Sequence, residues 1–93
     1  MIMPRDRQEY RKKVASQLYV LGEDSGHYTA VTVDISDCGV CMVTNKDVRP
    51  GQTVRIYSED LWPVPVKAKA VWRSHLACET SKVGLVICDI ADN

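Results

Sequence analysis

Short apolar segments separated by turn residues run through this chain from residue 14 onward, and their spacing indicates strands. Residues 14–21 are rich in β-forming side chains, a turn cluster follows over 22–26, and residues 27–35 alternate in character. In the alternating segment one side carries Thr29, Val31, Val33 and Ile35, and the other carries Tyr28, Ala30, Thr32 and Asp34. We expect the first of these two sides to face the core.

The later segments continue the pattern. We expect strands over 40–44, 53–57, 66–73 and 83–90, a loop over 45–52, and a break over 58–63. Pro63 and Pro65 restrict their segment to a sheet edge or a strand start. The clearest alternation in the chain sets Val66, Ala68, Ala70 and Trp72 against Lys67, Lys69, Val71 and Arg73. Six short strands without a long helix predict an all-β fold, a small antiparallel barrel or sandwich.

The charge of the chain is balanced overall but uneven along its length. The 93 residues suit one domain, with a formal charge of zero and a pI near 6.7. This balance argues against a nonspecific nucleic-acid binder, which carries a uniform basic field. The first thirteen residues nevertheless carry a net +3 and form a basic arm. No apolar stretch suits a membrane span or a signal peptide, so we expect a cytoplasmic protein without membrane insertion.

The four cysteines are expected to be reduced thiols buried in the structure, as in most cytosolic proteins: Cys38, Cys41, Cys78 and Cys88. The first two form a C-x-x-C, which leaves a zinc or thiol protein open as a minor alternative. The other two form no second close pair, so we expect no metal and no cofactor. His27 and His75 stand apart and receive no role. Because no histidine lies near Ser36 in sequence, we assign no catalytic residue and expect no enzyme.

Two short motifs carry the most specific chemistry in the chain. Arg7 to Arg11 forms an R-x-x-x-R, and Asp34 to Gly39 forms a D-x-S-x-x-G. An arginine fork stacks on a base while it donates paired hydrogen bonds to a phosphate or to the O6/N7 edge of guanine. A carboxylate accepts from the N1–H and N2–H₂ edge of guanine, a serine hydroxyl adds a donor and acceptor, and a glycine permits a close approach. At average residue frequencies the ordered pair arises by chance in under about one chain in a hundred of this length.

Each motif taken alone also has a simpler explanation. The simpler explanation for the arginines is a solvated basic terminus that carries Arg5, Arg7 and Arg11. An aspartate with a serine at a strand end commonly forms an Asx or Ser turn. Trp72 alternates with alanines and indicates a core side chain or a pocket wall, with base stacking as the alternative. Trp62, beside Pro63, indicates an exposed loop anchor or a partner contact.

With these motifs in this order, the chain resembles the PilZ domain family of bacterial cyclic di-GMP receptors over nearly its whole length. Weaker matches are Pro50-Gly51 before a strand, Val71-Trp72, and Gly84-Leu85 in the last strand. The resemblance implies a six-stranded β-barrel over residues 14–93, preceded by a flexible N-terminal arm over residues 1–13 that carries the arginines. It also implies that Arg7 and Arg11 clamp the ligand, that Asp34 and Ser36 hold a guanine edge, and that Gly39 shapes the turn. Arg5 and Trp72 are secondary ligand-binding candidates.

The function expected from the motifs and the resemblance together is a stand-alone cyclic di-GMP receptor that changes shape and signals to a protein partner, as a monomer or homodimer. Two alternatives remain open. The first is a PilZ-like interaction module that binds no nucleotide. The second is a small barrel that binds single-stranded nucleic acid through basic and aromatic side chains, which the net neutrality disfavours.

Overall fold

All the regular structure in the described part of the chain is strand. A computed structural model describes residues 12–23, 26–36 and 38–90. Its strands are β1 (Lys12–Lys13), β2 (Gln17–Leu21), β3 (His27–Ile35), β4 (Gly39–Thr44), β5 (Thr53–Ser58), β6 (Trp62–Ala77) and β7 (Thr80–Ile90). Within these ranges no helix is long and apolar enough to cross a membrane. The all-β prediction is confirmed.

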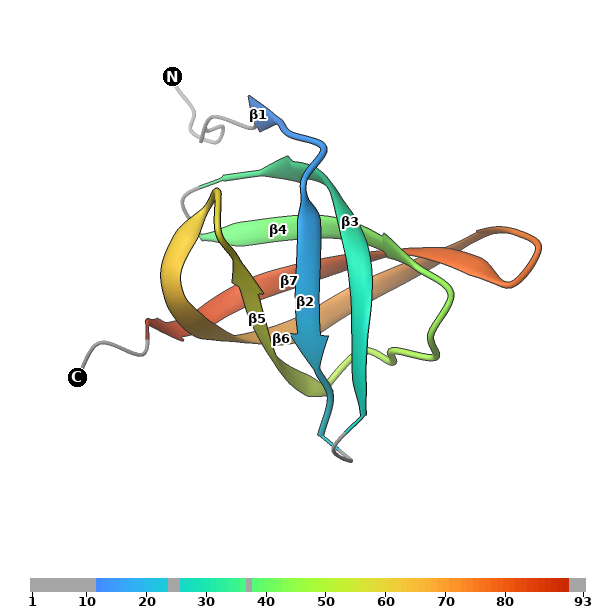
Figure 1. Ribbon diagram of the computed structural model, residues 1–93. Coiled ribbons are helices and arrows are strands. Elements are labelled where there is room, and N and C mark those ends of the chain that lie inside the picture. The colour runs from blue at the N-terminus through green and yellow to red at the C-terminus, as the bar shows by residue number, and fades with distance from the viewer. Residues whose placement is uncertain (1–11, 24–25, 37, 91–93) are drawn as a thin grey trace, which may run out of the picture.

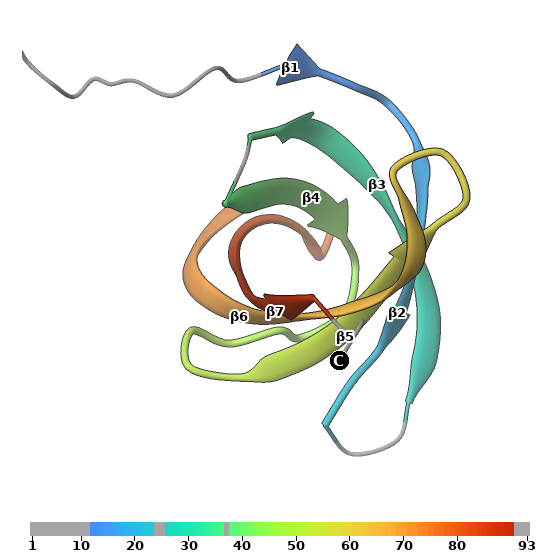
Figure 2. The same ribbon diagram turned by 90° about the vertical axis from the view of Figure 1, so that its left-hand side faces the viewer.

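The strands form a closed antiparallel barrel of six strands. Hydrogen-bonded neighbours follow the order β3-β2-β5-β6-β7-β4, and the pairing of β4 with β3 closes the ring. The ring is visible in Figure 1 and, from the side, in Figure 2. β1 pairs with the end of β3, beyond the part that pairs with β2. The strand expected over 14–21 is therefore interrupted, and closure leaves the barrel without a long open edge.

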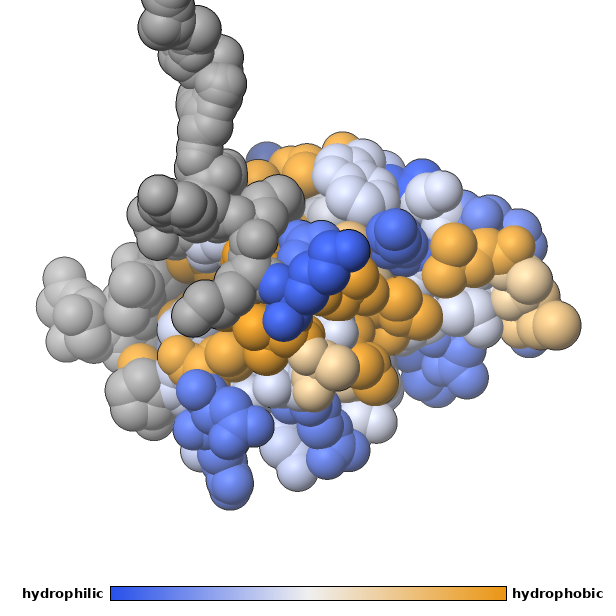
Figure 3. Space-filling model, turned by 90° about the horizontal axis from the view of Figure 1, so that it is seen from above, coloured by the Kyte–Doolittle hydropathy of each residue, from blue (hydrophilic) through white to orange (hydrophobic). Residues whose placement is uncertain are grey.

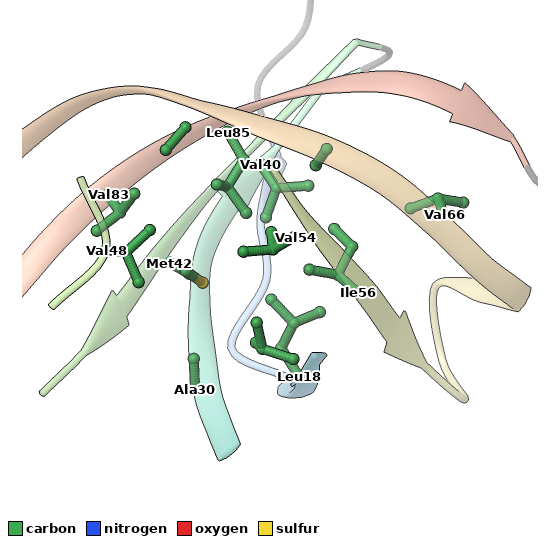
Figure 4. Packing of buried hydrophobic residues seen from close by; sticks show 13 residues of the cluster. Leu18, Ala30, Val40, Met42, Val48, Val54, Ile56, Val66, Val83 and Leu85 are labelled. Carbon is green, nitrogen blue, oxygen red and sulfur yellow. The ribbon is translucent and has the colours of Figure 1, made fainter. Parts of the chain in front are cut away.

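Side chains from all six barrel strands fill the interior (Figure 4). The largest of the fully buried ones include Leu18, Met42, Ile56, Val40, Val66 and Val83. Val66, Ala68 and Ala70 point inward as their alternation predicts, while Lys67 and Lys69 are exposed. A closed barrel of six strands has little room inside, so the small side chains of the alanines fit this part of the interior.

The predicted core face of β3 is wrong for most of the strand. Ala30 and Thr32 are buried, Tyr28 packs against the core, and Val31 is 50% exposed. The pairing with β4 is irregular between Thr32 and Asp34, so the alternation of faces shifts by one residue there. Beyond this bulge Ile35 packs against the core, as predicted. A buried threonine is tolerated inside because its hydroxyl is hydrogen-bonded.

β6 and β7 form a hairpin that is longer than expected and projects beyond the barrel (Figure 1). Its two-residue turn, Cys78 and Glu79, has positive φ angles of 52° and 64°, as a tight hairpin turn requires. At the other end, Pro63 and Pro65 precede the ladder with β7, which begins at Val66, so the prediction of a strand start is confirmed.

Two further expectations for single side chains need correction. Trp62 is the first residue of β6 and packs partly buried against the core, so it is no exposed loop anchor. Of the four thiols only Cys41 is buried, whereas Cys38, Cys78 and Cys88 are exposed. Cys88 lies in an apolar run of sequence, but the alternation of β7 turns it outward, with its Sγ 3.7 Å from the carbonyl oxygen of Val86.

Candidate functional site

The D-x-S-x-x-G motif forms the corner between β3 and β4. The backbone N–H of Ser36 donates to the carbonyl oxygen of Gly39 at 2.9 Å and closes the turn. A Cβ at Gly39 would lie 3.0 Å from the carbonyl oxygen of Leu85 and 3.7 Å from Ser36 Oγ, so there is little space for a side chain at this position. Ser36 Oγ is buried and has no hydrogen-bond partner among the described residues. The corner thus packs Gly39 closely against the backbone of β7 and beside the Ser36 hydroxyl.

β1 brings the basic N-terminal segment to this corner. Lys13 pairs with Asp34 and Lys12 with Ile35. Arg11 directly precedes this pair in the chain. Arg5, Arg7 and Arg11 themselves lie outside the described residues. The described end of the predicted arm, Lys12–Lys13, therefore lies beside Asp34, one of the predicted ligand residues.

A hydroxyl group holds the junction between β1 and β2. Thr32 Oγ1 accepts a hydrogen bond from the N–H of Ser16 at 2.9 Å and donates one to the carbonyl oxygen of Val14. The N–H of Val14 also donates to the carbonyl oxygen of Val33, at 3.2 Å. The side chain of Thr32 therefore replaces ladder hydrogen bonds where the strand is interrupted, and it fixes the path by which the arm reaches β3.

The strand register places five residues in one row across the barrel: Lys13, Asp34, Cys41, Gly84 and Trp72, from β1, β3, β4, β7 and β6. The sequence neighbours of Cys41 and Gly84 on their own strands are core residues, so the row lies on the outer face. Sequence reasoning did not single out Lys13, because only the register reveals that it neighbours Asp34.

Trp72 forms the far end of this row. An added Cβ at Gly84 would lie 2.2 Å from Cε2 and Nε1 of the indole, so the ring lies directly against the glycine backbone. Trp72 is 43% exposed, which corrects its assignment to the core. An irregularity between Ala70 and Trp72 turns the side chain outward. Two strand spacings, about 10 Å, separate Gly84 from Asp34.

A second outer row begins at the glycine of the corner. Gly39 pairs with Val86, and Val86 pairs with Lys69 of β6. Val86 is 41% exposed and Lys69 is also exposed. Figure 3, the view from above, shows exposed apolar side chains gathered in a band with hydrophilic ones at its borders. The alternation in the sequence sets Lys69 opposite Ala68 and Ala70, and the register adds that it shares a row with Gly39.

Other features of the described residues differ in chemistry from the corner. An apolar pocket of about 440 Å³ lies over β2 and β5 and includes Tyr19, Tyr57 and Pro65, and none of the motif residues lines it. The corner differs from this pocket because its motif residues Asp34 and Ser36 are polar. The described residues hold no cluster of three His, Cys, Asp or Glu side chains suited to a metal ion.

One carboxylate away from the corner has a shifted pKa. The pKa of Asp47 is lowered from its ordinary value of 3.8, first by a hydrogen bond from Arg49 and second by one from Arg73. The Nη1 atom of Arg73 lies 2.6 Å from the Asp47 carboxylate and the Nη2 atom of Arg49 lies 3.1 Å from it. This exposed trio ties the loop before β5 to the projecting hairpin.

Comparison with known proteins agrees with the fold and the motifs. Residues 5–93 match the model of the family described as PilZ domain. Among solved structures, that of the Bacillus subtilis inhibitor of motility (MotI/DgrA) is similar with a TM-score of 0.74 and 16% sequence identity, over 96% of this chain and 45% of that chain. The chain thus spans less than half of that protein, and at this identity the likeness is one of fold. A search of curated proteins found no match. Since the family model covers both motifs and the entire barrel, the chain belongs to the PilZ domain family.

Proposed function

We propose that this chain is a receptor for cyclic di-GMP that signals to a protein partner and catalyses no reaction. The observation that supports the proposal is the pairing of Lys12 and Lys13 of β1 with Ile35 and Asp34 of β3, because these lysines directly follow the arginine motif in the chain. We propose that permanent cations from the segment before β1 and the carboxylate of Asp34 on β3 act on one ligand. A dianionic nucleotide with exposed guanine edges satisfies both.

The roles follow from the chemistry of each group. The Asp34 carboxylate accepts from guanine N1–H and N2–H₂, and the Ser36 hydroxyl, buried and without a partner in the described structure, supplies a further hydrogen bond. Gly39 lets the base approach the backbone. Arg7 and Arg11 bind phosphates and guanine faces, with Arg5 as a secondary contact. Trp72 presents one exposed face of its indole, on which a second base stacks.

Binding is proposed to act through the arm. A ligand held between the arm and the corner orders the arm against β3 and creates a surface that a downstream protein reads. The family of cyclic di-GMP receptors and the motility inhibitor among its structural neighbours both support an adaptor of this kind. We place the protein in the bacterial cytoplasm, as a monomer or homodimer that takes part in second-messenger signalling.

The test is calorimetric titration with cyclic di-GMP, with GTP as the ligand control. We expect saturable binding to the wild-type protein and its loss in Arg7→Ala and in Asp34→Ala. Glu59→Ala removes an exposed carboxylate in the β5–β6 turn and should leave binding unchanged. Failure of the well-folded wild-type protein to bind would refute the receptor proposal and favour an interaction module that binds no nucleotide.

A further inference from the structure

We infer that Lys69 binds the half of the ligand that lies away from Asp34, through its second phosphate or the O6/N7 edge of its second guanine. The inference rests on the proposed function and extends it across the barrel from β3 to β6. It assigns a ligand contact to a lysine outside both sequence motifs.

The register gives the geometry. Gly39, Val86 and Lys69 lie side by side on the outer face of β4, β7 and β6. Two strand spacings, about 10 Å, separate the backbone of Gly39 from that of Lys69. The ammonium group stands on a flexible four-carbon stem that shortens this distance further. Among the described residues the side chain has no ion-pair partner, so its charge is available to an anion.

The shape of the outer face directs the ligand along this row. In the neighbouring row the indole of Trp72 already covers Gly84, so the backbone there is closed to a base. The row that starts at Gly39 has no side chain at its first position and only the exposed Val86 at its second. A cyclic dinucleotide whose first guanine is held by Asp34 and Ser36 therefore extends over Gly39 and Val86. It meets Lys69 two strands away from Gly39, with Trp72 in the neighbouring row.

Lys67 provides a matched control. It lies on the same strand and the same outer face, two residues or about 7 Å away, and is likewise exposed. Its cross-strand neighbours are Arg55 on β5 and Asp89 on β7, so it belongs to a row that does not include the corner. Lys67→Met and Lys69→Met thus remove the same charge from the same face of one strand, but from different rows.

The experiment compares wild type, Lys69→Met and Lys67→Met by calorimetry, with cyclic di-GMP and with GMP, which has one guanine and one phosphate. We expect Lys69→Met to weaken cyclic di-GMP binding about tenfold, or about 1.4 kcal/mol, while Lys67→Met changes it less than twofold. GMP fills only the half of the site beside Asp34, so its affinity should be equal in all three proteins.

The outcomes separate the two proposals. Suppose that the wild-type protein binds cyclic di-GMP and that Asp34→Ala abolishes this binding. If both lysine substitutions then weaken the binding equally, or if neither weakens it, the inference about Lys69 is wrong and the receptor function stands. A loss of GMP affinity in Lys69→Met would place the lysine at the first guanine and also refute the inference. If the folded wild-type protein does not bind cyclic di-GMP, both proposals fail.

Discussion

Replacing Thr32 with valine isolates the hydroxyl that holds the junction between β1 and β2. The two side chains have nearly the same shape, so the change removes one hydrogen bond from Ser16 N–H and one to Val14 C=O. Both orphaned groups lie near exposed residues and regain part of their hydration, so we take about 1 kcal/mol for each, the lower end of the cost of an unsatisfied group. The added methyl group returns up to about 0.8 kcal/mol through burial.

The net loss is therefore about 1–2 kcal/mol, which lowers the melting temperature of a domain of this size by about 5–15 °C. Thermal unfolding followed by circular dichroism measures this. Hydrogen exchange at the Ser16 amide should accelerate at the same time, because Thr32 Oγ1 is its acceptor. Thr29→Val, an exposed change on the same strand, should stay within about 0.5 kcal/mol. An unchanged melting temperature together with an unchanged Ser16 exchange rate would refute a structural role for the hydroxyl.

Two further perturbations test other parts of the structure. Gly84→Ala should displace the Trp72 indole, since the new Cβ would lie 2.2 Å from the ring; overpacking of this kind costs about 1–3 kcal/mol, and a red-shifted tryptophan emission should accompany it. Unshifted emission would show that the ring does not lie on Gly84. Because the folded pKa of Asp47 is lowered, its ion pairs stabilise the fold above the ordinary carboxyl pKa of 3.8, and that contribution is lost as the pH falls below this value. Asp47→Asn should therefore lower the melting temperature slightly at about pH 7 and by progressively less as the pH falls below 3.8, and an effect that does not change with pH would contradict this.

The sequence pattern predicts strands well where alternation is unbroken and fails at irregular positions. In β6 the alternation of Val66, Ala68 and Ala70 with lysines identifies the core face directly. In β3 Val31 points outward, because Thr32 satisfies its hydroxyl inside, and a bulge shifts the faces before Ile35. Hydrophobicity alone cannot predict which face of β3 is buried, since this depends on hydrogen bonds between Thr32 and a segment far away in sequence.

The residues of the candidate site also divide into those that the sequence identifies and those that only the structure identifies. The corner residues Asp34, Ser36 and Gly39 could be found from one motif, because their spacing is local. Lys13 and Lys69 could not, because each becomes a neighbour of the corner only through strand register. Trp72 was identified as a wall or core residue, and only the irregularity after Ala70 decides that it faces outward.

Alternation along β6 and β7 also assigns stability and recognition to different residues of the same strands. Ala70 and Leu85 pair on the inner face and belong to the core, whereas Lys69 and Val86 pair on the outer face and remain exposed. Exposed positions of this kind contribute little to the free energy of unfolding. Outer-face substitutions such as Lys69→Met should therefore change ligand binding at nearly constant stability, while a larger side chain at Ala70 should destabilise the barrel before it affects the ligand. The barrel can thus vary what it binds between β3 and β6 without altering the core that holds those strands in register.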